Sequence, residues 1–184
     1  MPGRQAITFQ ERKQGMGNIT EEENNPFAEL RTYNPDIIDD GVVDEEGYLS
    51  AKYKIMYVLK EVNGGKGWSL REFVRNGGRP QTWDNFARWT EAILDLDAER
   101  PWSYWEKDNE ARRNRILKMI CAVNVKKTSG GHTSNADEIY QAAIDNSAIL
   151  QKQLNLYDPD IIIAVARKKH LSMHAIKIKN WTGK

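Results

Sequence analysis

The sequence predicts an α/β fold, a three-layer αβα sandwich around a central, mostly parallel sheet. Three short apolar runs, at 53–59, 121–125 and 160–166, are long enough for strands and too short for buried helices. Helical patterns separate these runs, and strands that alternate with helices are typical of parallel sheets. The run at 160–166 is apolar throughout, as is usual for a strand that helices cover on both faces.

The segments that flank the predicted strands have less regular patterns. Residues 1–30 are polar with little periodicity, so we expect a flexible or loosely docked arm, followed by a domain spanning residues 31–184. The segment 36–50 has a turn signal at Asp40-Gly41, and we expect a small hairpin or loop there. The segment 174–181 alternates weakly and is expected to form a short edge strand.

Four segments have the apolar spacing of helices. They are 69–78, which ends at a pair of glycines, 82–96, 108–120 and 134–157. Thr82 is the expected N-cap of the second, and Ser134 with Asp137 has the pattern of a capping box for the last.

The composition is that of an ordinary globular domain with unevenly distributed charge. The chain has 184 residues, enough for one domain with its own core, and 40% are hydrophobic and 29% charged. Residues 1–50 contain 4 Lys/Arg and 11 Asp/Glu, a net charge of −7, whereas the remainder contains 23 and 15, a net charge of +8. A basic body suits a polyanion such as DNA, and the acidic N-terminal region suits a protein partner with a basic surface. A solvated surface with uneven charge is the alternative.

Several classes of protein are disfavoured by the sequence. No apolar run is long enough to span a membrane, and the opening residues lack the apolar core of a signal peptide. We therefore expect a cytoplasmic protein with no membrane partner. Cys121 is the single cysteine, which excludes an internal disulfide and a cysteine-built metal site. We expect no metal or other cofactor, and we interpret Cys121 as a buried strand residue.

Two loops follow the first two predicted strands, at the edge of the sheet where α/β proteins bind ligands. The loop 60–68 contains Glu61 and three glycines, which let backbone N–H groups approach a ligand closely; a plain flexible turn explains them equally well. The loop 124–131 begins with Asn124, a polar residue in an otherwise apolar strand. Its amide either reads the edge of a planar ligand, by donating and accepting at once, or is satisfied by neighbouring backbone.

Positive charge and aromatic rings accompany these loops. Trp68 and Phe73 are candidates for a face on which a base stacks. Aromatic residues at helical spacing in 82–96 are expected to lie in the core instead. The candidate phosphate-binding set consists of Lys126, Lys127, Gly130 and Gly131.

A resemblance to the uracil-DNA glycosylase superfamily is carried by the segment VNVKKTSGGHTSNADEIYQAAIDNSAILQKQLNLYDPDIIIA. It is similar to one branch that has an Asn-x-x-Lys-x-x-Pro-type loop, a helix and then a strand opened by Pro-Asp. The segment YVLKEVNG lies where that branch has a strand and Gly-Glu-Ala-Pro-Gly, and WSLREFVRNGG lies where it has Phe-Val-Gly-x-x-Gly. The resemblance covers roughly residues 53–166.

The resemblance implies a glycosylase-like fold and a site for an altered base of DNA. Glu61 matches the acidic residue that positions or activates the attacking water. Phe73 matches the aromatic residue that stacks on the flipped base, a role for which Trp68 competes, and Asn124 matches the asparagine that hydrogen-bonds the base. Such a site hydrolyses the N-glycosidic bond of uracil or another altered base after the base leaves the stack.

The chain departs from that family at its C-terminal end. None of its histidines, His132, His170 and His174, precedes a proline, so the family's His-Pro motif is missing and the fold is expected to be trimmed. The alternative function is therefore a catalytically inactive binding protein on the same fold. Examples are a phage or mobile-element inhibitor of a host nuclease, such as an RNA-guided one, or a homodimeric interaction module.

Overall fold

The computed structural model describes residues 18–165 and the backbone of residues 176–178. These residues form a mixed five-stranded sheet in the order β1-β3-β2-β4-β5. The central strands β2 (Ile55–Leu59), β3 (Ile120–Asn124) and β4 (Ile161–Ala164) run parallel, and the edge strands β1 (Gly41–Val42) and β5 (Ile176–Ile178) run antiparallel to their neighbours. The α/β class and the three parallel strands of one sheet are confirmed.

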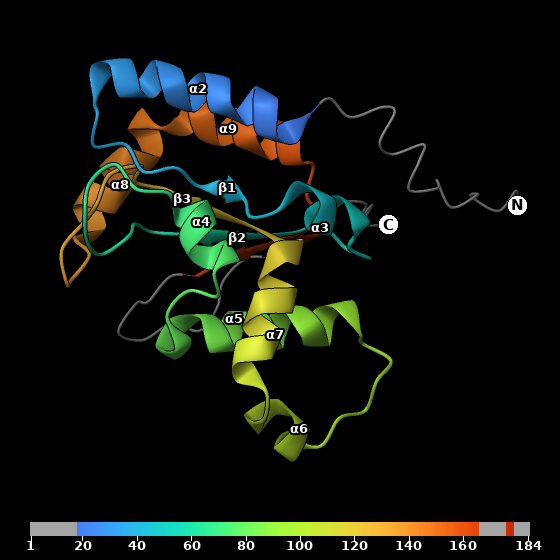
Figure 1. Cartoon of the computed structure of the whole chain (residues 1–184). Helices are drawn as coiled ribbons and strands as arrows, with labels where there is room; N and C mark the ends of the chain where they lie inside the picture. Colours follow the sequence, from blue (N-terminus) through green and yellow to red (C-terminus); the bar gives the residue numbers. More distant parts are fainter. Residues whose placement is uncertain (1–17, 166–175, 179–184) are drawn as a thin grey trace, which may run out of the picture.

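Helices cover both faces of this sheet (Figure 1). One face carries α4 (Leu70–Arg75), α5 (Pro80–Leu94) and α7 (Asn109–Ile116), whose apolar side chains share a core with β2 and β3. The other face carries α2 (Ile19–Tyr33) and α9 (Ser147–Tyr157), which pack on the opposite side of the same strands. The short elements are α3 (Glu45–Ser50), α6 (Trp102–Glu106), α8 (Ala136–Asp145) and the 3-10 turn Leu117–Met119.

The expected flexible arm over residues 1–30 is wrong from residue 19 onward. Residues 19–33 form α2, capped by the side chain of Asn18, and α2 lies against α9 (Figure 1). Ile19, Glu23 and Phe27 are buried at four-residue spacing, which places them on one stripe of the helix. The helix is part of the core, so the predicted domain boundary at residue 30 is wrong; residues 1–17 lie outside the described residues.

Several element boundaries and caps differ from those that the local sequence signals predict. The segment 36–50 contains β1 and α3 in place of the expected small hairpin or loop, because β1 pairs with β3. The helix expected at 134–157 is divided into α8 and α9 at Asn146, and the side chain of Asn135, in place of Ser134, caps α8. Helix α5 begins at Pro80 without a side-chain cap, so the N-cap expected at Thr82 is wrong.

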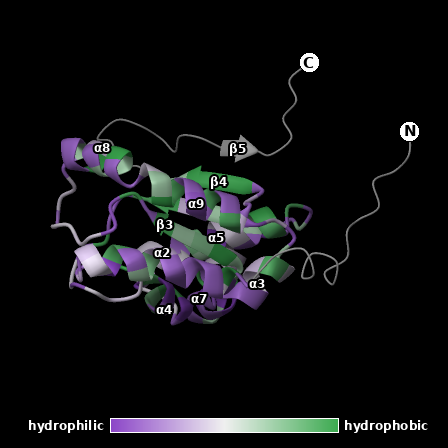
Figure 2. Cartoon of the chain, turned by 90° about the horizontal axis from the view of Figure 1, so that it is seen from above, coloured by the Kyte–Doolittle hydropathy of each residue, from purple (hydrophilic) through white to green (hydrophobic). Residues whose placement is uncertain are grey.

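Hydropathy follows these layers. In Figure 2 the strand β4 is hydrophobic along its length, whereas the helices carry both hydrophilic and hydrophobic residues. Within residues 18–165, no helix combines the length and the apolar character that crossing a membrane requires.

Candidate functional site

A cavity of about 560 Å³ lies at the carboxyl ends of the parallel strands. Its walls come from the end of β2, the loop that follows it, helix α4, the first turns of α5 and the end of β4. The sheet edge is the one at which α/β folds bind ligands, and the volume lies in the range of small-molecule sites. The lining residues that matter below are Glu61, Trp68, Phe73, Arg79, Thr82 and Trp83.

Aromatic rings line much of this cavity. The half-buried rings of Trp68 and Phe73, both predicted from the sequence, lie 5.4 Å apart at an interplanar angle of 77°. Trp83 and Phe86, expected in the core, are buried there and also line the cavity. The two rings are themselves packed edge-to-face, an arrangement that aromatic pairs favour, so a planar ligand can stack on only one of them at a time.

Asn124 lies at the end of β3 on the face of the sheet that carries the cavity. It is directly opposite Leu59, which lines the cavity. Successive side chains of a strand point to opposite faces of the sheet. Ala122 packs with the core on the cavity side and Val123 with the core on the other side, so Asn124 is again on the cavity side. The prediction that the two loops lie side by side is confirmed, since Val125 and Lys126 continue the pairing with the end of β2.

The amide of Asn124 is buried without a hydrogen bond. The residue is 1% exposed, and neither its side-chain nitrogen nor its side-chain oxygen has a partner among the residues that the structure describes. Its backbone N–H donates to Asp40 at 2.7 Å, so only the side chain is unsatisfied. A buried polar group without a partner costs about 1–3 kcal/mol. Of the two interpretations of Asn124, satisfaction by neighbouring backbone is therefore wrong for the described residues.

Glu61 lines the cavity, but a cation holds its carboxylate. The side chain is 4% exposed, and Lys126 Nζ lies 3.1 Å from Glu61 Oε2. Gly130 lies against the same carboxylate, and a Cβ at this position would come within 2.0 Å of Glu61 Cδ. Glycine at 130 is thus what lets the second loop pack against Glu61.

Most of the candidate phosphate-binding set is already engaged. Lys127 is 2% exposed and donates to both oxygens of Asp40 at 2.9 Å, so its assignment to phosphate is wrong. Lys126 also pairs with Glu138 at 2.8 Å, and the hydrogen bonds to Glu138 and to Glu61 raise the pKa of its ammonium group. The N–H of Gly130 donates to the carbonyl of Val62. Gly131 is exposed, with open space where a side chain would be.

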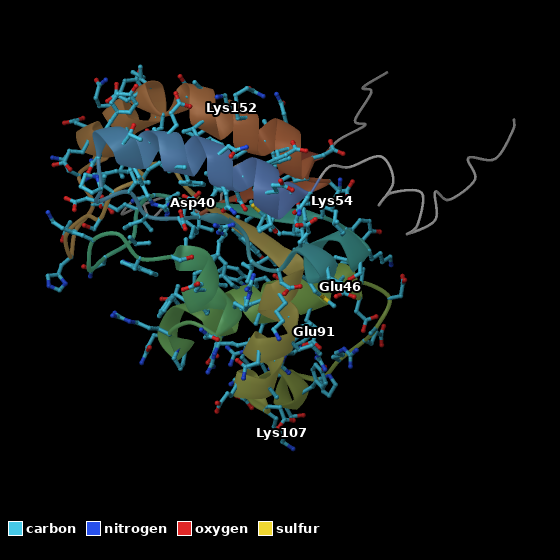
Figure 3. The ribbon with its side chains drawn as sticks, turned by 45° about the horizontal axis from the view of Figure 1, so that its top comes forward. Asp40, Glu46, Lys54, Glu91, Lys107 and Lys152 are labelled. Atoms are coloured by element: carbon cyan, nitrogen blue, oxygen red, sulfur yellow. The ribbon has the colours of Figure 1, made fainter. Side chains whose placement is uncertain are left out.

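A chain of buried polar groups lies behind the site, on the side of α2 and α9. Asp40, marked in Figure 3, accepts from Lys127 and from Gln153, and Gln153 also donates to Tyr157. Tyr157 donates to Glu23, which pairs with a guanidinium of α4. Sequence patterns did not identify these groups, because all but one of these contacts join segments far apart in the sequence; the exception is the contact between Gln153 and Tyr157, one turn apart on α9.

Glu23 is a buried carboxyl whose pKa is shifted far from its ordinary value. Burial raises its pKa to about 7, although Arg71 at 2.6 Å and the hydrogen bond from Tyr157 act in the opposite direction. The raised value means that folding favours the protonated carboxyl at neutral pH.

No family model, curated protein or solved structure matches this chain. Within the described ranges, His, Cys, Asp and Glu side chains form no group of three that could hold a metal ion. His132 is exposed beside Asn63 at 3.3 Å, whereas His170 and His174 lie outside the described residues. The geometry of the cavity is therefore the basis for inferring a function.

Proposed function

We propose that this chain binds a DNA strand, takes an altered base such as uracil into the cavity, and hydrolyses its N-glycosidic bond. The unpartnered amide of Asn124 is the observation that carries the proposal. A folded chain keeps a buried polar group without a protein partner at a cost, and such groups occur where a ligand, an ion or a bound water supplies the missing hydrogen bonds.

The ligand that suits this amide is a nucleobase. A nucleobase edge presents a donor next to an acceptor, which complements the oxygen and the nitrogen of Asn124. The rings of Trp68 and Phe73 offer stacking faces to a planar base outside the duplex. Since the amide is covered, the side chains that cover it must move when the base enters.

The chemistry would require Glu61 to leave Lys126 for a water molecule. The water oxygen bonds to C1′ of the sugar while the bond from C1′ to the base nitrogen breaks, its electron pair staying with the base. Glu61 accepts the proton of the water. The amide N–H of Asn124 donates to the base oxygen on which negative charge develops, which stabilises the leaving group.

Binding without turnover is the second candidate, and the state of Glu61 favours it. A carboxylate that is 4% exposed and held at 3.1 Å by Lys126 is not placed to receive a water proton. On this alternative the cavity still accepts a base, and the protein acts by occupying a strand or a nucleic-acid enzyme, as an inhibitor of a host nuclease would.

The test is release of free base from single-stranded oligonucleotides that each carry one uracil or hypoxanthine. We expect the wild-type chain to release base and Glu61→Gln to slow release by about a hundredfold or more, the usual contribution of a general base. Strand affinity should stay unchanged in Glu61→Gln, because contacts to phosphate dominate it. Binding with no release by the wild type supports the second candidate, and failure to bind any strand contradicts both.

A further inference from the structure

The rim of the cavity carries a cation without a partner. Arg79 lines the cavity, is exposed, and forms no hydrogen bond or ion pair through its guanidinium with the described part of the chain. Other cations of the nearby loops are engaged: Lys66 pairs with Asp36, and Lys126 and Lys127 pair with carboxylates as described above. Arg79 is therefore a positive charge at the cavity that an anionic ligand can use.

The backbone around Arg79 fixes its place. Gly77 and Gly78 have φ values of +91° and +60°, in the region that favours glycine, and they turn the chain from α4 into α5. A Cβ on Gly78 would lie 2.2 Å from the ring of Trp83, so glycine also allows this ring to pack against the turn. Arg79 follows as the N-cap residue of α5, and Pro80 starts the helix.

The first turn of α5 adds to the positive potential at this point. The helix has 15 residues, no side-chain cap and no acidic residue in its first turn, so no carboxylate neutralises the partial positive charge of its N-terminus. The hydroxyl-bearing residue Thr82 also lines the cavity. Trp83, one turn after Arg79, forms part of the aromatic wall about 6 Å further along the helix axis.

We propose that Arg79, with the first turn of α5, binds the strand phosphate next to the base held in the cavity. The inference rests on the proposed function and replaces Lys126 and Lys127 as the principal phosphate contact. Two observations support such a ligand: the unpartnered guanidinium of Arg79 at the rim, and the unpartnered amide of Asn124, which lies behind the cavity wall beside the lining residue Leu59. A nucleotide unit carries a planar base and an anion joined by a sugar, which suits both.

The first test measures the affinity of a uracil-containing single strand as a function of salt for the wild type, Arg79→Gln and Arg79→Lys. Each phosphate contact to a single strand contributes about 0.7 to the slope of log K against log salt. Between 50 and 200 mM salt, the loss of affinity should therefore be about 2.6-fold smaller in Arg79→Gln than in the wild type. Arg79→Lys keeps the charge and should keep the slope.

The matched control is Lys152→Gln on α9, on the opposite face of the sheet (Figure 3). This change also removes one exposed positive charge, and the slope should not change. Equal slopes for the wild type and Arg79→Gln overturn the inference while leaving the proposed function intact. Absence of strand binding by the wild type overturns both. Thermal unfolding of each variant confirms that the fold is kept.

The second test separates a strand phosphate from the phosphate of a free nucleotide. Deoxyuridine and its 5′-monophosphate are titrated against the wild type and Arg79→Gln. The inference predicts that the monophosphate binds more tightly than the nucleoside to the wild type only, and that the strand slope falls in Arg79→Gln as well. If the monophosphate effect is present but the strand slope is unchanged, a free nucleotide is the ligand and the assignment to a strand is wrong.

Discussion

Replacing Asn124 by valine should raise the stability of the fold while removing base binding. The amide of Asn124 is buried at 1% exposure with two unsatisfied polar atoms, so the native state carries a cost that an apolar side chain does not have. Valine also has a high propensity for strands, and positions 120–123 of the same strand are apolar and buried.

The size of the effect follows from the two unsatisfied atoms. An unsatisfied buried donor or acceptor costs about 1–3 kcal/mol. Imperfect packing of the valine side chain offsets part of the stability gained by removing these atoms, since shape changes in a core usually cost less than about 1.5 kcal/mol. We expect a net increase of about 1–2 kcal/mol in the free energy of unfolding, or about 2–8 °C in Tm for a chain of this length.

Urea denaturation of the wild type, Asn124→Val and Thr90→Val provides the assay and its control. Thr90 is also fully buried, but its hydroxyl pairs with the hydroxyl of Tyr57 at 2.9 Å. Thr90→Val removes a satisfied group and leaves Tyr57 without its partner, which should lower the free energy of unfolding by about 1–3 kcal/mol. If Asn124→Val destabilises the fold as Thr90→Val does, the Asn124 amide has a partner in the native state and the basis of the proposed site is lost.

Three further predictions concern the buried polar chain and α2. Burial raises the pKa of Glu23 from 4.5 to about 7, so the folded state binds its proton more tightly and the free energy of unfolding should fall by up to about 3 kcal/mol as pH rises through this window. Glu23→Gln should flatten that dependence in pH-resolved urea denaturation, and an unchanged profile would contradict it. Phe27→Ala should lower the free energy of unfolding by about 3–5 kcal/mol, because the ring is fully buried. A loss below about 1 kcal/mol, measured by calorimetry, would instead support a flexible arm over this segment. Lys127→Met should lower the free energy of unfolding by about 3–5 kcal/mol, because it leaves Asp40 buried without its cation. Adding Asp40→Asn should recover part of this loss. If the double variant is no more stable than Lys127→Met, the pair is not what stabilises this region.

The parallel centre of the sheet could be predicted from the sequence because its signals are local. Three apolar runs of strand length, separated by helical patterns, predict β2, β3 and β4 within two residues at each end. Neighbouring parallel strands bring their carboxyl ends together, which is why Glu61 and Asn124 could be expected at one edge.

The burial of α2 could not be predicted in this way. Its stripe of buried residues, Ile19, Glu23 and Phe27, contains a carboxylate, and a segment with so few apolar residues reads as solvated. Glu23 is tolerated in the core because Tyr157, 134 positions away in the sequence, and Arg71 supply its partners. No window of the sequence contains that pairing.

The same limit applies to the phosphate contacts. A lysine beside a pair of glycines is typical of an anion site, and the composition of the loop gave no sign that Lys127 points inward. Asp40, 87 residues earlier, makes Lys127 a buried structural cation. No sequence pattern indicates a role for Arg79, because Gly77 and Gly78 predict only a helix end, whereas the turn that they form also places the start of α5 at the cavity.

The central claim is that the cavity binds a base, and one comparison of affinities tests it most directly. Two single strands of the same sequence are titrated at the same salt concentration, one with a uracil and the other with an abasic sugar at that position. The phosphate contacts are equal in both, so any difference in affinity reports the base. We predict tighter binding of the uracil strand by the wild type and equal binding of the two strands by Asn124→Val. Equal affinities for the wild type would contradict the claim.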